Sequence, residues 1–305
     1  MTRALVLSGG GPVGIAWQTG LAAGLAAKGV DLREADFILG TSAGSAVGAQ
    51  LALGREMATV LERYRQTPAA AASSSSSAGL SAGRTSATAA SPARMQELMR
   101  IMAESAASDG TPEEARALIG RFALASETGP EEAFVAGFSH LADEPFPQGY
   151  ACTAVDAETG AFQVWDAEAG VPLDRAVASS CAVPGVFPPI TIGGRRYIDG
   201  GMRSGTNADL AAGHATVLLV TLMGGARSSA TAPTDARLQR YLERMSRERQ
   251  VLLDAGASIE TIAPDEASAA VIGANLMDGR LSPAAAEAGF RQGEAAAASV
   301  HDAWS

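Results

Sequence analysis

The sequence predicts an α/β fold in three layers, α/β/α, around a mainly parallel central sheet, and three observations support this prediction. Short apolar runs at residues 4–7, 37–39 and 216–222 are typical of buried strands in a parallel sheet. Glycines and then a helical pattern follow each of the first two runs. The chain of 305 residues, 47% of them hydrophobic, suffices for one such domain with a large core.

The first part of the chain alternates strands and helices, as a βαβ unit requires. The strand at 4–7 is followed by a helix of small residues, in which Gly20 and Gly24 should allow close contact against the sheet. The second strand spans about Asp36–Leu39. Three helices are expected in this part, at Ile15–Lys28, Gly44–Leu53 and Glu56–Arg65.

Residues 67–145 are predicted to form an insertion that consists of a flexible loop and a helical cap. Ala69–Ser91 contains almost only Ala, Ser, Gly and Thr, so it has too little apolar surface to offset the entropy lost on ordering. This loop is either a plain surface insertion or a lid beside a site. Helical patterns follow at Pro92–Ala107, Pro112–Ala125 and Glu131–Leu141. Their apolar stripe, which either packs in the core or lines a pocket, consists of Met95, Leu98, Met99 and Met102.

The remaining elements are expected to complete the sheet and cover it. Four segments should pair as two hairpins, at Gln148–Val155 with Ala161–Trp165 and at Ile190–Ile192 with Arg196–Ile198. Further elements are a short helix at Leu173–Cys181, a buried strand at Thr216–Leu222, a charged helix at Thr234–Leu253, a strand at Ser258–Ala263 and a final Ala-rich helix. We therefore expect one domain over residues 1–222, with an extension of helices and a strand over 223–305 that packs on it.

Composition and charge exclude several classes of function. The net charge of −10 argues against nucleic-acid binding, which needs a basic face, and against tight electrostatic docking on anionic membranes. Contact with lipid would have to come from exposed apolar surface, as a transient contact with a membrane surface. Cys152 and Cys181 make no disulfide framework, and neither has His or Cys neighbours at ligand spacing, so no metal site is expected.

The N-terminal region carries no signal peptide pattern, because Arg3 is its only basic residue and a glycine loop interrupts the apolar run. No apolar stretch reaches the ~18 residues of a transmembrane helix. These observations predict a cytoplasmic protein with no obligate protein partner.

The pentapeptide Gly40-Thr41-Ser42-Ala43-Gly44 is the first motif that carries chemistry. It follows a predicted strand directly, as a G-x-S-x-G serine on a sharp turn into a helix. Such a turn lifts the serine hydroxyl out of the backbone, where a carbonyl carbon can reach it. Gly40 and Gly44 give room for a strained turn and for the helix that follows. Ser42 is therefore a candidate nucleophile.

The glycine loop after the first strand allows two interpretations. Gly9, Gly11 and Gly14 satisfy the G-x-G-x-x-G fingerprint of a dinucleotide-binding oxidoreductase. That interpretation needs an acidic residue at the end of the second strand, whereas Asp36 stands at its start. Alternatively, glycines at a helix N-terminus expose backbone N–H groups that can hold an oxyanion.

The third motif is Asp199-Gly200-Gly201, which follows the short strand ending in Ile198. The aspartate stands at a chain reversal, and the two glycines leave its carboxylate open to a neighbouring hydroxyl. A plain hairpin turn is the alternative interpretation of any Asp-Gly pair.

Taken together, the glycine loop, the G-x-S-x-G turn and the distant Asp-Gly-Gly resemble, in this order, the patatin-like phospholipase family. A fourth stretch, residues 178–189, looks like that family's A-S-x-A-x-P-x-x-F-P-P segment. The resemblance covers roughly residues 4–221. It implies a patatin-like fold, a serine acyl hydrolase activity on lipid or carboxylic esters without a cofactor, and a variable insertion between nucleophile and base.

The resemblance also implies roles for single residues. Ser42 would be the nucleophile and Asp199 the base of a Ser–Asp dyad. The oxyanion hole would be formed by Gly9, Gly10 and Gly11. Burial beside Ile198 and the Phe-Pro-Pro segment should raise the pKa of Asp199, which makes its carboxylate a better base.

One residue departs from the family pattern, in which G-G-G-x-R-G has an arginine where Val13 stands here. Backbone donors do not depend on that side chain, although Pro12 offers no N–H and the donors must come from the glycines before it. A non-catalytic lipid-binding module is the alternative that this departure leaves open.

A Ser–His–Asp triad is the rival mechanism, since the chain has three histidines. His214 follows Asp199 at a loop position, and His301 has the terminal position of the common α/β-hydrolase order; the third is His140. Ser42 stands on only the second strand, which is too early for that fold, so the dyad is favoured.

Overall fold

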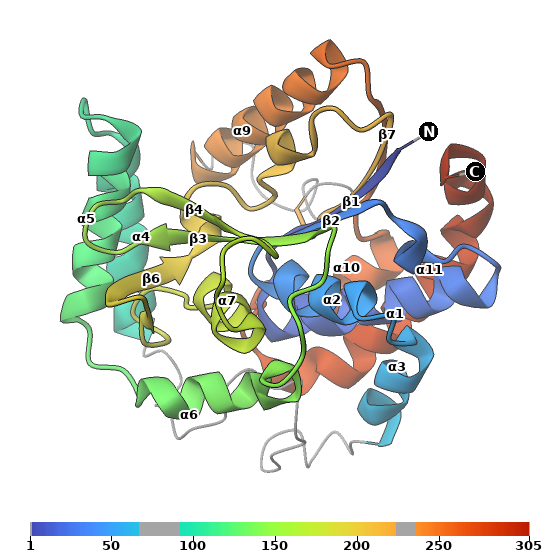
Figure 1. The fold of residues 1–305 in the computed structure, drawn as a ribbon, viewed down its shortest axis with the longest axis horizontal. Helices are drawn as coiled ribbons and strands as arrows, with labels where there is room; N and C mark the ends of the chain where they lie inside the picture. The colour runs from blue at the N-terminus through green and yellow to red at the C-terminus, as the bar shows by residue number, and fades with distance from the viewer. Residues whose placement is uncertain (1, 67–91, 224–235, 305) are drawn as a thin grey trace.

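The computed structural model describes residues 2–66, 92–223 and 236–304, and its strands form one mostly parallel sheet flanked by helices (Figure 1). The predicted fold class is therefore confirmed. Along the sheet the order is β5-β6-β3-β2-β1-β7-β8, and β4 pairs with β3 outside this path. The strands are β1 (Arg3–Leu7), β2 (Phe37–Gly40), β3 (Tyr150–Asp156), β4 (Phe162–Trp165), β5 (Ile190–Ile192), β6 (Arg195–Asp199), β7 (Thr216–Val220) and β8 (Ser258–Ile262).

Most of the helices lie in the connections between these strands, and the last two follow β8. They are α1 (Gly11–Ala27), α2 (Ala43–Ala52), α3 (Met57–Gln66), α4 (Pro92–Ala106), α5 (Pro112–Ala125), α6 (Glu131–Val135), α7 (Leu173–Ser180), α9 (Ala236–Asp254), α10 (Glu266–Ile272) and α11 (Ser282–Trp304). The predicted helix at Glu131–Leu141 is only partly α-helical, because α6 passes into a 3-10 helix over Ala136–Leu141.

The parallel part of the sheet consists of β3, β2, β1, β7 and β8, whereas β4, β5 and β6 run antiparallel to their neighbours. β1 and β7 lie at its centre and are almost entirely apolar, as strands covered on both faces must be. The carboxyl ends of parallel strands share one edge of the sheet, and the turns that leave β1 and β2 therefore lie side by side.

Alternate residues of the central strands face two separate apolar cores. Leu5 and Leu7 of β1 belong to the core beneath α1, α2 and α11, whereas Ala4 and Val6 belong to the core beneath α9. Figure 1 shows α9 on one side of β1 and β2, with α1 and α2 on the other. The period-2 alternation of a strand thus builds the three layers.

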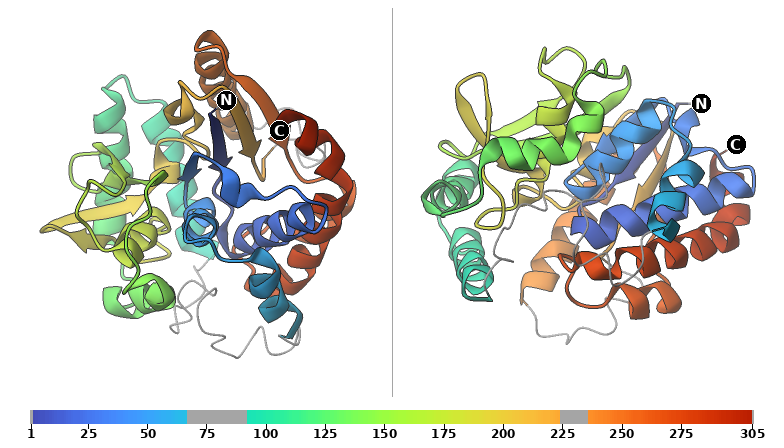
Figure 2. Two further views of the ribbon diagram at one scale, coloured as in Figure 1. Left: turned by 45° about the vertical axis from the view of Figure 1, so that its right-hand side comes forward. Right: turned by 90° about the horizontal axis from the view of Figure 1, so that it is seen from below.

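Helices α1 and α11 run side by side with very close backbones (Figure 2). A methyl group on Gly20 would lie 1.9 Å from the Ala286 carbonyl oxygen, and one on Gly24 would lie 2.1 Å from the Phe290 carbonyl oxygen. The prediction that these glycines allow close contact is right about the contact and wrong about the partner. The partner is α11 rather than the sheet, because α1 is buried on nearly all sides and its glycines face the C-terminal helix.

We predict that Gly20→Ala destabilises the protein, although alanine is the better helix former by about 1 kcal/mol. The added methyl group has no space, so α1 and α11 must move apart, and the free energy of unfolding should fall by about 1–3 kcal/mol. Urea unfolding followed by circular dichroism measures this change. The control is Ala58→Gly on the exposed side of α3, which reports helix propensity alone. A Gly20→Ala protein as stable as the parent would contradict the packing described.

The insertion helices α4 and α5 cover the part of the sheet that carries Asp199. Leu98 of α4 is buried in a core cluster with Ile198 of β6, while Met95 and Met102 pack partly buried against it. This favours core packing for the apolar stripe. The predicted loop Ala69–Ser91 lies outside the described residues.

A capping box formed by Thr111 and Glu114 stands at the N-terminus of α5, which explains why a helix begins there.

Candidate active site

Ser42 stands in a strained backbone conformation at the turn between β2 and α2. Its φ of 52° and ψ of −118° lie outside the regions that a residue with a side chain normally occupies. A methyl group on Gly40 would lie 2.4 Å from Ser45 Cα, and one on Gly44 would lie 2.1 Å from the Leu7 carbonyl oxygen. Only glycine fits at these two positions, so the sequence G-x-S-x-G is what this tight turn requires.

The backbone of the strained turn is held by hydrogen bonds from the following helix and from a distant segment. The Ser42 N–H donates to Ser180 Oγ at 3.0 Å, and the Ser42 carbonyl accepts from Ser45 Oγ at 2.6 Å and from Cys181 Sγ at 3.2 Å. Ser180 and Cys181 end α7, within the segment that resembles the A-S-x-A-x-P pattern. Sequence reasoning missed their contribution, and the resemblance of this segment is the signal that could have found it.

The antiparallel strand β6 brings Asp199 to the same edge of the sheet as Ser42. β2 ends at Gly40, which pairs with Cys152, but β3 continues four residues beyond that level. β6 pairs with this extension in the opposite direction, so that Asp199 lies opposite Ala154 and the chain then runs back toward the end of β2. Gly200 fits against β3 because it lacks a side chain, since a methyl group there would lie 2.2 Å from Thr153 Oγ1.

The structure thus joins the two candidate residues. The Ser42 side chain lies close enough to the Asp199 carboxylate to lower its pKa by hydrogen bonding, and Asp199 Oδ1 accepts the Gly201 N–H at 2.7 Å. Burial, with Asp199 only 3% exposed, raises the pKa of its carboxyl to about 6, although the two hydrogen bonds act in the opposite direction. A buried carboxylate with this pKa is chemically suited to accept a proton from a neighbouring hydroxyl.

The glycine loop lies next to Ser42, but its three glycines differ in their hydrogen bonds. A methyl group on Gly9 would lie 3.3 Å from Ser42 Cβ, and the Gly9 N–H donates to the Gly205 carbonyl at 2.9 Å. Gly10 and Gly11 begin α1, and within the described parts of the chain no acceptor is bonded to their N–H groups. Two backbone donors therefore stand at the positive end of a long helix, next in the chain to Gly9, which lies beside Ser42.

The Ser8 carbonyl connects this loop to the nucleophile turn and to a buried side chain of α1. The Ser8 carbonyl accepts from Gln18 Nε2 at 2.8 Å and from the Gly44 N–H at 3.1 Å. Gln18 is 1% exposed, on an apolar helix. Sequence reasoning missed it, although a lone glutamine among small apolar residues was the available signal.

Val13, which departs from the family pattern, lies in the apolar core with no exposed surface. Its N–H donates to the Leu276 carbonyl at 3.3 Å. Leu276 also covers Gly11, where a methyl group would lie 2.6 Å from the same carbonyl oxygen and where φ is +58°. The segment before α11 therefore supports the glycine loop on this side.

Two of the histidines lie far from Ser42. The ring of His214 stacks on Phe37 with centroids 5.2 Å apart, and Phe37 is the first residue of β2, at the end opposite Ser42. His301 lies in the last turn of α11, a helix of 23 residues that begins beside Pro12. That length places His301 about 30 Å from the glycine loop.

The third histidine, His140, lies beyond the C-terminal end of α2, since its carbonyl accepts from Arg55 at 2.9 Å. Ser42 is at the other end of the same helix. Burial lowers the pKa of His140 to about 4. The geometry therefore favours the Ser–Asp pair over a Ser–His–Asp triad.

The described residues contain no group of His, Cys, Asp and Glu side chains suited to hold a metal ion, and Cys152 and Cys181 are buried free thiols. Within the same residues, every helix is too short or too polar to cross a bilayer.

Comparisons with known proteins place these motifs in a family. The model of a family described as patatin-like phospholipase matches residues 5–212. Uncharacterized NTE family proteins of Mycobacterium bovis and Mycobacterium tuberculosis are each 32% identical over 126 residues, which cover 39% of this chain and 32% of the relative. The aligned part thus spans about a third of the length of these curated relatives.

Among solved structures, VipD from Legionella pneumophila aligns with a TM-score of 0.44 and 13% identity, over 98% of this chain and 67% of that chain. The type III effector protein ExoU aligns with a TM-score of 0.33 and 16% identity, over 96% of this chain and 53% of that chain.

Proposed function

The chain belongs to the patatin-like phospholipase family, and on that premise we propose that it is a serine acyl hydrolase that cleaves lipid or carboxylic esters. One observation carries the proposal: the strained Ser42 lies near enough to the buried Asp199 to influence its pKa, which burial raises to about 6. A polar pair that costs both backbone strain and desolvation is typical of a catalytic site.

In the first step the Ser42 oxygen attacks the ester carbonyl carbon while Asp199 accepts the hydroxyl proton. The strained turn presents the hydroxyl at the sheet edge, and a hydrogen bond to Asp199 would direct its proton toward the base. The tetrahedral intermediate then expels the alcohol, which takes the proton from Asp199. An acyl group remains on Ser42.

The negative oxygen of the intermediate would be stabilised by the N–H groups of Gly10 and Gly11, at the N-terminus of α1. We propose that Gly9 is not an oxyanion donor, because its N–H is bonded to the Gly205 carbonyl. Its role would be to leave space above Ser42, since it has no side chain. In hydrolases one oxyanion donor contributes about 3–4 kcal/mol to the barrier reduction. In the second step Asp199 activates water, which releases the acid from Ser42.

The substrate class follows from the family, since phospholipids, lysophospholipids, acylglycerols and simple esters all present the same acyl carbon to Ser42. The net charge of −10 disfavours electrostatic docking on anionic bilayers. We therefore propose that contact with a lipid surface is transient and apolar, and that uncharged interfaces are hydrolysed faster than anionic ones.

The activity should rise with pH through about pH 6, because Asp199 accepts a proton only when its carboxyl is ionised and burial raises its pKa to about 6. Below that pH, kcat/KM should fall tenfold for each pH unit. Initial rates with a soluble p-nitrophenyl ester between pH 4 and pH 8 measure this acid limb. A limb near pH 4, as expected for a solvated carboxylate, would contradict the burial argument.

A fluorophosphonate probe tests the proposal, since it phosphonylates activated serines. We expect labelling of Ser42 in the parent protein and none in Ser42→Ala. Hydrolysis of a p-nitrophenyl ester, measured on the same two proteins, should be lost together with the labelling. Absence of labelling in the folded protein would favour the non-catalytic lipid-binding module. Tight binding of a nicotinamide cofactor, measured by calorimetry, would instead favour the dinucleotide interpretation of Gly9, Gly11 and Gly14.

A further inference from the structure

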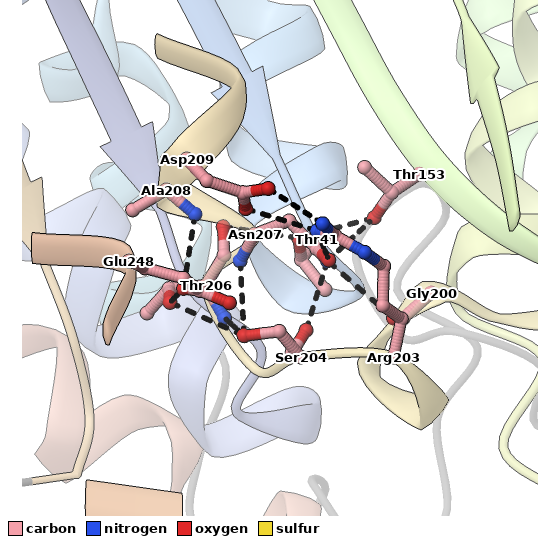
Figure 3. Close-up of polar contacts among 10 residues, drawn as sticks. All are labelled: Thr41, Thr153, Gly200, Arg203, Ser204, Thr206, Asn207, Ala208, Asp209 and Glu248. Atoms are coloured by element: carbon pink, nitrogen blue, oxygen red, sulfur yellow. Dashed lines mark hydrogen bonds and ion pairs between the residues drawn. The ribbon is translucent and has the colours of Figure 1, made fainter. Parts of the chain in front are cut away.

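A single loop, residues 203–209, contacts the three segments that form the site, and Figure 3 shows its contacts with Thr41 and Gly200. At its centre is Asn207, which has no exposed surface and a left-handed backbone with φ of 51°. Ser42 and Asn207 are the only residues other than glycine with positive φ in the described parts of the chain. Asparagine tolerates this conformation better than most residues, but burying its amide requires partners on every side.

The Asn207 side-chain nitrogen contacts both catalytic turns at once. It lies 3.0 Å from Oγ1 of Thr41, the residue before Ser42, and 3.4 Å from the carbonyl of Gly200, the residue after Asp199. Thr153 Oγ1 of β3, the strand between the two turns, is 3.2 Å away. The amide has two hydrogens, and these oxygens share them with the Ser204 carbonyl at 2.8 Å.

The orientation of the amide follows from its other end. Asn207 Oδ1 accepts from Arg203 at 2.8 Å, and a guanidinium can only donate, so the nitrogen must face the cluster of oxygens. Arg203 is itself held by both carboxylate oxygens of Asp209, at 2.9 and 2.5 Å, and lies over the Phe162 ring. Figure 3 shows the Arg203 side chain reaching from Gly200 toward Asp209 and Asn207.

The residues on either side of Asn207 are attached to α9. Glu248, which is 6% exposed, accepts from the Thr206 hydroxyl and from the Ala208 N–H at 3.1 Å. Gly205 of the same loop accepts the Gly9 N–H from the glycine loop. The loop thus contacts the nucleophile turn, the base turn and the glycine loop, while a carboxylate on the opposite layer anchors it.

We propose that Asn207 is a positioning residue whose side-chain amide fixes the nucleophile turn relative to the base turn, and so holds the Ser42 hydroxyl against Asp199. The inference rests on the proposed function of this pair. Asn207 touches no reacting atom, and it acts through Thr41 and Gly200. A displacement of about 1 Å between the two turns would lower the rate about 100-fold.

Asn207→Gly tests this inference, because glycine keeps the left-handed backbone and removes only the amide. Enzyme is titrated with the fluorophosphonate probe, and kcat and KM for a soluble p-nitrophenyl ester are measured per titrated site. We expect kcat to fall about 100-fold while KM stays within about twofold. The acid limb should also move above pH 6, because the Ser42 hydrogen bond that lowers the pKa of Asp199 is weakened.

Two further variants separate positioning from general stability. Val300→Ala removes a buried side chain at the far end of α11 and should lower the melting temperature without changing kcat per site or the acid limb. Thr41→Val removes the hydroxyl that contacts Asn207, and Thr41→Ser retains it, so the serine variant should recover most of the kcat that the valine variant loses. This pair carries the test if Asn207→Gly does not fold.

The outcomes are distinct. An unchanged kcat per site and an unchanged acid limb in Asn207→Gly, or equal kcat in Thr41→Val and Thr41→Ser, would overturn the positioning role while leaving the hydrolase intact. Absence of labelling in the parent protein would instead contradict the proposed function, and this inference with it.

Discussion

Ser42→Ala is expected to lower the rate of ester hydrolysis by about 10⁴- to 10⁶-fold, the largest effect of any single substitution in this chain. Alanine removes the hydroxyl that attacks the carbonyl and leaves the backbone turn, its flanking glycines and the N–H groups of Gly10 and Gly11 in place. Those donors alone cannot form an acyl-enzyme. The rate with a p-nitrophenyl ester at pH 8 is the measurement.

The matched control for this prediction is Ser299→Ala, on the exposed side of α11. It makes the same chemical change and should leave the rate within experimental error of the parent. Fluorophosphonate labelling should disappear only in Ser42→Ala. A Ser42→Ala protein that keeps a tenth of the parent activity would show that another group is the nucleophile.

Asp199→Asn is expected to lower kcat by about 10³- to 10⁴-fold, by analogy with the loss of other catalytic carboxylates. The amide has nearly the same shape, and its oxygen can still accept from Ser42 and from the Gly201 N–H, but it does not take a proton at neutral pH. The residual rate should no longer fall with decreasing pH near pH 6. Assays that are incubated for long times and then stopped measure this slow residual hydrolysis at each pH.

The same substitution should raise the stability of the folded protein at high pH, which distinguishes it from a substitution that lowers the rate by disrupting the structure. The folded pKa of Asp199, about 6, lies above its ordinary value of 3.8, so the folded state binds this proton more tightly than the unfolded state. The parent should therefore lose stability as the pH rises from about 4 to above 6, and Asp199→Asn should not. At pH 8 the variant should melt at a higher temperature, while a lower one would contradict the cost assigned to the buried charge.

The parts of the site that the sequence could predict are those in which one short segment specifies its own geometry. A glycine on each side of Ser42 and the glycine directly after Asp199 are needed because neighbouring backbone leaves no room for a Cβ. The two turns can therefore be recognised from the sequence alone. The strands β1 and β7 are also evident, because a strand buried on both faces must be apolar throughout.

The parts that the sequence could not predict depend on contacts between distant segments. The sequence gives no way to distinguish the three glycines Gly9, Gly10 and Gly11. Only the position of Gly205 in the structure shows that the Gly9 N–H already has an acceptor. Asn207 looks like a polar loop residue until Thr41 and Gly200 are brought beside it. In each case the partner is chosen by sheet order, which no local pattern encodes.

The partner of Gly20 and Gly24 was missed for a related reason. Apart from Gln18 and Thr19, α1 contains only apolar or small residues, so the helix has no polar face to show which surface meets the sheet. The contact with α11 joins segments more than 260 residues apart, at Gly20 and Ala286.

Peptide mapping by mass spectrometry after acid quenching tests the central claim, that the Ser42 hydroxyl attacks the ester carbonyl with Asp199 as its base. Enzyme turning over a slowly hydrolysed ester is stopped in acid, digested and searched for the mass of the acyl group. We predict that the acyl group is found on Ser42 in the parent protein and is absent from Asp199→Asn quenched at the same time. Undiminished hydrolysis with the acyl group on a different residue would contradict the account.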